Sequence, residues 1–268
     1  MARNIRRAHR RLAVRTMLAA VVAAAPLAVA APAQAADGPA IIAHRGDSKA
    51  APENTTAAFR SAVAKGAETI EMDVRFTSSH YPVIMHDATL DRTTNCSGSV
   101  ANKTRTQLAG CDAGSWFSAT YRGEHVPSLD SALSTIASRS SSAVVMLHIK
   151  AVPNGDRAAR IRDSVRRYGM AGRVIVIADT SSILTQMKAV GFNALGRVFS
   201  TSSGWDLRYP YLIPYNLPLS SARISAVHRR GGMVLPVEGE PYGLDYLFNV
   251  ASLDGILVNH LSTALNRS

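Results

Sequence analysis

Acidic residues are absent from the first 36 positions of the chain, whereas six arginines lie within the first 15. An uncharged apolar run from Met17 to Ala30 follows, and a stretch of small residues ends at Ala35. This order is typical of a secretory signal peptide, so we expect residues 1–35 to be cleaved and the mature protein to be secreted. The Arg10-Arg11 pair leaves the twin-arginine export route open beside the general secretory route.

A long apolar segment is missing after this leader, and the leader's own run is shorter than the roughly 20 residues that span a bilayer. A clustered basic stripe is missing too. Without the six leader arginines, 24 basic and 19 acidic residues remain, so the formal charge falls from +11 to +5. These absences argue against a stable membrane span and against nucleic-acid binding, whereas a mildly positive domain is compatible with a phosphate-bearing substrate.

Cysteine is nearly absent, since only Cys96 and Cys111 occur. Two cysteines without nearby histidines are a poor basis for a metal site. Because an exported chain meets an oxidising compartment, we expect a disulfide between them; two reduced, buried thiols are the alternative.

The length that remains after the leader, about 230 residues, is typical of one α/β barrel. Short β-branched runs alternate with helical patterns, as in βα units around a parallel sheet. We therefore predict a (β/α)8 TIM barrel, with strands at 40–43, 69–74, 82–85, 144–149, 174–178, 194–199, 233–237 and 255–258. Asn54 is expected to cap the first helix and Gly66 to end it.

One polar, turn-rich segment interrupts this alternation between Asp87 and Pro127. A loop of that length in a compact domain usually has a function or a small fold of its own. Because it contains both cysteines, we predict a disulfide-closed insertion at about 87–127, after the third strand, within one barrel domain spanning residues 36–268.

Ionisable residues stand at the ends of the first four predicted strands. They are His44 and Arg45, Glu71 and Asp73, His86 and Asp87, and His148 and Lys150. Strand ends of a parallel barrel face one shared pocket, and buried charges are costly unless they are paired or bound to a metal. Four successive strand ends of this kind therefore indicate a functional site.

Glu71 and Asp73 are two residues apart, so they project from the same face of their strand. Two carboxylates in that arrangement can hold a hard cation such as calcium, magnesium or manganese. Arg45 and Lys150 supply the cationic groups that a phosphodiester needs. The histidines of the first and third strands can act as acid and base near neutral pH.

Six segments, in this order, resemble the glycerophosphodiester phosphodiesterase family: HRGDSKAAPENTTAAF, ETIEMDV, PVIMHDATLDRTT, DAGSWF, VPSLDSAL and SLDGILV. The resemblance runs along nearly the whole mature chain. It implies a barrel enzyme that uses calcium or magnesium to hydrolyse glycerophosphodiesters to glycerol 3-phosphate and an alcohol. By position, it implies that His44 and His86 are the acid/base pair, Arg45 and Lys150 contact the phosphate, Glu71 and Asp73 bind the metal, and Glu53 supports these residues from behind. For Glu53, a favourable contact with the dipole of the following helix is the alternative.

Three positions depart from the family pattern. His148 stands where the family has a third acid, so one anionic donor becomes a neutral nitrogen; we take His148 as a metal ligand. Calcium should then bind less tightly, with manganese, cobalt or zinc less affected. LPVEGEP replaces an aromatic stretch, which makes Glu238 or Glu240 a candidate to return an acid to the pocket. Asn259 replaces an aspartate, and His260 is expected at the surface.

We expect a monomer that acts on a small glycerophosphodiester, and export adds glycerol-phosphate polymers of cell walls as candidate substrates. Two other functions stay open. One is a sphingomyelinase or phospholipase D type of enzyme, which shares the barrel and the histidine pair. The other is a noncatalytic phosphate-binding protein that lost turnover through the change at His148.

Overall fold

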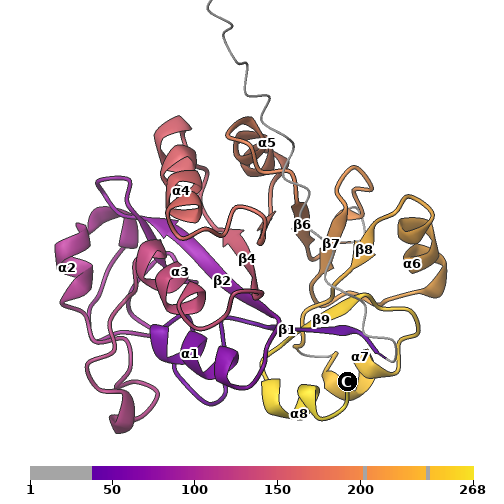
Figure 1. The fold of residues 1–268 in the computed structure, drawn as a ribbon, viewed down its shortest axis with the longest axis horizontal. Coiled ribbons are helices and arrows are strands. Elements are labelled where there is room, and N and C mark those ends of the chain that lie inside the picture. Colours follow the sequence, from indigo (N-terminus) through magenta and orange to yellow (C-terminus); the bar gives the residue numbers. More distant parts are fainter. Residues whose placement is uncertain (1–37, 202–203, 240–241) are drawn as a thin grey trace, which may run out of the picture.

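The computed structural model describes residues 38–201, 204–239 and 242–268 (Figure 1). The leader predicted at residues 1–35 and the candidate acid Glu240 lie outside the described residues. Within the described ranges, none of the helices combines the length and the hydropathy of a bilayer-spanning segment.

Eight parallel strands form a nearly closed barrel in the order β8-β7-β6-β5-β4-β2-β1-β9 (Figure 1). Their bounds are Ala40–Ala43 (β1), Thr69–Phe76 (β2), Val144–Ile149 (β4), Val174–Ala178 (β5), Leu195–Phe199 (β6), Tyr211–Pro214 (β7), Met233–Val234 (β8) and Gly255–Val258 (β9). A parallel bridge between Val237 and Leu257 brings the chain after β8 back to β9. The predicted TIM barrel is confirmed.

The strand assignment was wrong at two places. The run at 82–85 is no barrel strand: β3, Pro82–Ile84, pairs antiparallel with β2 and lies off the barrel path. The reason is the short connection after β2, because a parallel partner needs a crossover of about a dozen residues or more. The missed barrel strand is β7, whose short run ends in Pro214 and so gives a weak strand signal.

Helices cover the outside of the barrel (Figure 1). They are α1 Thr56–Ala64, α3 Leu129–Ala137, α4 Gly155–Arg167, α5 Ser181–Ala189, α6 Ser221–His228, α7 Leu244–Phe248 and α8 Leu261–Leu265. Strand residues alternate between two cores, as the period of two requires. Ile41 and Val145 pack outward with the helices, whereas Ile42 and Met146 fill the barrel interior.

The start of α1 differs from the prediction, and its end agrees with it. Thr55 is the N-cap, since its side chain accepts a hydrogen bond from the Ala58 N–H. Asn54 has a positive φ of 58° and is turned away from the helix. Gly66 ends the helix in the left-handed region, with φ 82°, as expected.

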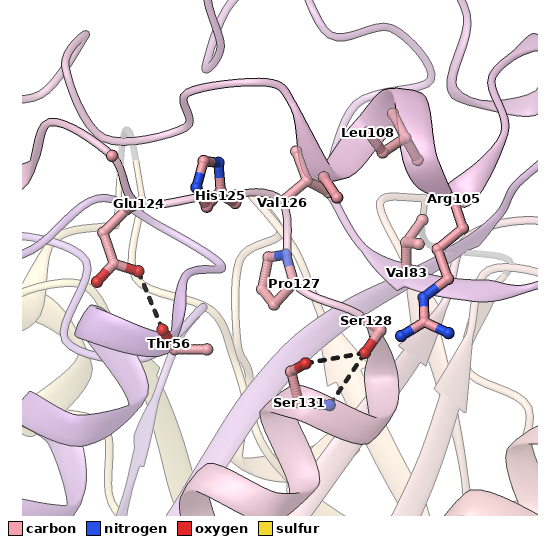
Figure 2. A pocket seen from close by; sticks show the side chains of 12 residues that line it. Thr56, Val83, Arg105, Leu108, Glu124, His125, Val126, Pro127, Ser128 and Ser131 are labelled. Carbon is pink, nitrogen blue, oxygen red and sulfur yellow. Dashed lines mark hydrogen bonds between the residues drawn. The ribbon is translucent and has the colours of Figure 1, made fainter.

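The insertion forms a small lobe with a core of its own, around Leu90 and Leu108. It contains η1 Val100–Asn102, α2 Arg105–Ala109 and η2 Ala119–Tyr121. Cys96 and Cys111 are bonded, which confirms the predicted disulfide. A hollow of about 330 Å³ lies between the lobe and the first helices, where Glu124 accepts a hydrogen bond from the Thr56 hydroxyl (Figure 2). None of the predicted site residues lines this hollow.

Candidate active site

Three ionisable side chains occupy positions on β2 and β4 that face the inside of the barrel. Glu71 and Asp73 alternate with Met72, which packs outward among the helices. On β4, Met146 belongs to the interior core, and His148 is the next residue on the same face. The parallel register pairs Asp73 directly with His148, so the three groups meet at the carboxyl ends of the two strands.

Glu71, Asp73 and His148 each offer one ligand atom within 4.8 Å of the others. His148 Nδ1 lies 3.4 Å from Asp73 Oδ1 and 3.8 Å from Glu71 Oε1. Those two carboxylate oxygens are buried and have no hydrogen-bond partner. Because unpaired buried oxygens are unfavourable, this donor set fits a divalent cation bound by all three residues.

The other oxygen of each carboxylate is held by the protein. Glu71 Oε2 accepts from the backbone N–H of Arg45 at 2.9 Å, which the left-handed φ of 58° at Arg45 makes reachable. Asp73 Oδ2 accepts from Asn54 Nδ2 at 2.8 Å, and the Asp73 N–H donates back to Asn54 Oδ1. Each acid thus has one oxygen fixed by hydrogen bonds, and its other oxygen faces the space between Glu71, Asp73 and His148 where a cation would bind.

In the cation-free protein, the pKa values of the two buried carboxyls are shifted in opposite directions. Burial and the adjacent Asp73 raise the pKa of Glu71 to about 8. Although burial opposes it, Lys150 and His148 hold the pKa of Asp73 well below its usual range. Glu71 therefore keeps a proton near neutral pH until a cation takes its place.

Two cationic side chains border the acids. Lys150 Nζ lies 3.4 Å from Asp73 Oδ1, and Arg45 Nε lies 3.5 Å from Asp73 Oδ2. Arg45 also donates to Glu53 at 2.9 Å, and Arg92 of the insertion donates to the same carboxylate at 2.8 and 2.9 Å. Glu53 thus anchors the guanidinium of Arg45, which is a larger role than contact with a helix dipole. Arg92 could not be predicted from the sequence, because nothing in a polar loop indicates that this arginine contacts Glu53.

The two predicted histidines each have a partner at Nδ1. His44 Nδ1 lies 2.9 Å from Asn259 Oδ1, whose amide nitrogen donates to the Glu238 carbonyl. His86 Nδ1 lies 2.6 Å from Asp87 Oδ1. Burial lowers the pKa of both rings, that of His44 to about 3, where the neighbouring Arg45 adds to the effect. Both imidazoles are consequently neutral at pH 7 in the cation-free protein.

One cavity of about 500 Å³ brings these groups together. It is lined by His44, Arg45, Glu71, His86, His148 and Lys150, and also by Asp179, Arg197, Phe199 and Tyr215. Asp179 was missed, although it directly follows β5 and the strand-end rule would have found it. Arg197 lies within β6, where no sequence pattern marks it as functional.

Glu238 does not return an acid to the metal site. Its carboxylate accepts from the backbone N–H groups of Asn259 at 2.6 Å and His260 at 3.1 Å, and it also pairs with the His260 ring. Glu238 therefore holds the loop after β9. His260 is half exposed, as expected of a surface residue, and its ring is hydrogen-bonded to Glu238.

A model of the glycerophosphoryl diester phosphodiesterase family matches residues 44–190. A glycerophosphodiester phosphodiesterase of Caldanaerobacter subterraneus is 36% identical over 148 residues, which are 55% of this chain and 61% of that protein. A relative from Bacillus subtilis is 50% identical over 93 residues, 35% of this chain and 38% of the relative. The chain thus matches less than two thirds of either relative's length.

Solved structures of similar proteins cover more of the fold. A glycerophosphodiester phosphodiesterase from Agrobacterium tumefaciens superimposes with a TM-score of 0.71 and 25% identity, over 84% of this chain and 99% of that one. An Oleispira antarctica phosphodiesterase in complex with the product sn-glycerol-3-phosphate gives a TM-score of 0.75 and 26% identity, over 85% of this chain and 96% of that one.

Proposed function

The chain belongs to the glycerophosphoryl diester phosphodiesterase family, and we propose that it hydrolyses glycerophosphodiesters to glycerol 3-phosphate and an alcohol. The observation that carries this proposal is that two histidines, the cationic side chains of Arg45 and Lys150, and a metal-ligand set converge on one cavity of about 500 Å³. The product complex of the Oleispira relative supports the identity of the phosphate-bearing product.

Charge on the phosphodiester is balanced from two sides. Glu71, Asp73 and His148 would hold a divalent cation, which would supply Lewis-acid stabilisation of the phosphoryl oxygens. Arg45 and Lys150 offer hydrogen bonds and positive charge from the cavity wall. The family resemblance implies calcium or magnesium, whereas the imidazole ligand admits manganese or zinc.

Proton transfer falls to His44 and His86. One ring takes the proton of the attacking oxygen, and the other, which must first become an imidazolium, donates its extra proton to the departing alkoxide. The Asn259 amide oxygen keeps the proton of His44 on Nδ1, so that its Nε2 carries the lone pair. Asp87 holds His86 in the same way, and its carboxylate stabilises the protonated ring.

The test is an assay of the cleaved mature protein with glycerophosphocholine, other glycerophosphodiesters and a glycerol-phosphate polymer. Glycerol 3-phosphate should form with a divalent cation and stop after chelation. Choline phosphate as the product would indicate the phospholipase type of cleavage instead. Ligand binding without turnover in any of calcium, magnesium, manganese or zinc would indicate a noncatalytic binding protein.

We also propose that the enzyme acts outside the cell. The leader sequence and the disulfide support this, because disulfides persist in oxidising compartments. Mass spectrometry of the culture medium should find a mature chain that starts near Ala36. Retention of the full chain inside the cells would contradict export.

A further inference from the structure

The His148 side chain is only 8% exposed, and both of its ring nitrogens lie close to carboxylate oxygens. Nδ1 faces the two oxygens of Glu71 and Asp73 that accept no hydrogen bond. On the opposite side of the ring, Nε2 lies 3.1 Å from Asp179 Oδ2. The ring therefore bridges the metal-ligand set and a third carboxylate, Asp179, that the family-based site did not include.

The barrel geometry aims Asp179 at this ring. The parallel register pairs His148 of β4 with Ile177 of β5, and Ile177 lines the cavity. Asp179 follows two residues later, so it projects from the same face just above the strand end. Its side chain is 53% exposed and also lines the cavity.

A carboxylate accepts hydrogen bonds, so the contact with Asp179 places a proton on Nε2 of His148. When a cation is bound beside Glu71 and Asp73, the lone pair of Nδ1 is then free to face it. Carboxylates behind metal-binding histidines raise the basicity of the ligating nitrogen.

We propose that Asp179 is a positioning residue of the metal site, which presents His148 as a nitrogen donor and tunes the site toward manganese over calcium. Nitrogen donors suit transition metals, whereas calcium prefers a full set of oxygens. The inference rests on the proposed function only in placing a cation at Glu71, Asp73 and His148. It requires no turnover.

Calorimetric titration of the chelator-treated protein with Mn²⁺ and with Ca²⁺ tests the proposal. Asp179→Asn keeps the size of the side chain and removes its charge, and we expect a 10- to 100-fold loss of Mn²⁺ affinity. Asp163→Asn is the matched control, because Asp163 is 55% exposed and lies on the far side of α4 from the cavity. His148→Glu should reverse the preference toward Ca²⁺. Equal Mn²⁺ affinity of Asp179→Asn and wild type would overturn the proposal.

The histidine tautomer is a second readout, taken on the Zn²⁺-bound wild type and so independent of how any variant folds. Nitrogen-15 NMR should find the His148 proton on Nε2, and a proton on Nδ1 would overturn the inference. Selective Mn²⁺ binding without hydrolysis would contradict the proposed function but leave this inference intact. Hydrolysis by the wild type, together with a Mn²⁺ affinity of Asp179→Asn equal to that of the wild type, would support the proposed function and contradict this inference.

Discussion

Asn259 Oδ1 lies 2.9 Å from His44 Nδ1, across the seam where β9 pairs with β1. An amide at this position orients the ring without adding charge to it. The Glu238 carbonyl accepts a hydrogen bond from the side-chain amide of Asn259, and the Glu238 carboxylate accepts one from the Asn259 backbone N–H. The protonation of His44 is thereby set by burial and by Arg45, with no anion at Nδ1 to offset them.

Replacing Asn259 with aspartate should raise the pKa of His44 from its value of about 3, because an adjacent carboxylate favours the imidazolium. NMR titration of the cation-free protein measures the shift directly. Asn259→Ala removes the hydrogen bond and should lower the pKa further. A downward shift in Asn259→Asp would show that the contact does not control the ring.

The cation-free protein should lose stability between pH 6.5 and 8. In that range unfolded Glu71 is ionised, while folded Glu71, with a pKa of about 8, still binds a proton, so raising the pH favours unfolding. The loss is on the order of 1 kcal/mol. His44 and His86 contribute below pH 6.5, where their lowered pKa values make stability rise with pH.

Urea unfolding at several pH values, with chelator present, measures this dependence. Glu71→Gln should flatten it, since glutamine cannot ionise. A saturating divalent cation should flatten it too, by displacing the Glu71 proton. A wild-type stability that rises from pH 6.5 to 8 would contradict the assigned protonation.

Loss of the disulfide should destabilise the insertion. The bond links residues 15 positions apart, and a closed loop of that size contributes about 3 kcal/mol in the chain-entropy account. Cys96→Ser/Cys111→Ser should therefore unfold at lower urea concentration and be cleaved by protease within residues 87–127 first. The reduced wild type is the matched control, and equal stability of the oxidised and reduced forms would refute the expectation.

His44→Ala and His86→Ala should each lower kcat by about 10²- to 10⁴-fold, the usual contribution of positioned acid/base catalysis. Cation binding should persist, because neither ring belongs to the three-ligand cluster. Steady-state kinetics with calorimetry separates the two effects. Normal turnover in either variant would remove that histidine from the mechanism.

The sequence predicted the positions of the site residues correctly wherever the two-residue period of a strand determines which side chains share a face. The spacing of Glu71 and Asp73 placed both acids on one face, and the strand ends placed His148 and Lys150 beside them. The same rule reaches Asp179, which was overlooked because the resemblance supplied a complete ligand set. The strand-like run of β3 misled, since such a run says nothing of its direction, whereas the short connection after β2 requires antiparallel pairing.

Asparagines were beyond prediction. Asn54 has the composition signal of a helix cap, and only the folded backbone turns it toward Asp73. Asn259 meets His44 from 215 residues away. Neutral amides leave no mark in charge or hydropathy patterns, so their partners emerge only when distant segments are packed together.

The antiparallel pairing of β3 separates the supports of the two histidines. His44 extends from the closed ring of strands, whereas His86 follows a strip that lies off it and continues into the disulfide-linked lobe. The order of the eight barrel strands includes no residue of the lobe, although Arg92 of the lobe holds Glu53 beside the site. Because His86 follows this strip and His44 follows a barrel strand, the spacing of the two imidazoles depends on how the strip is held against β2.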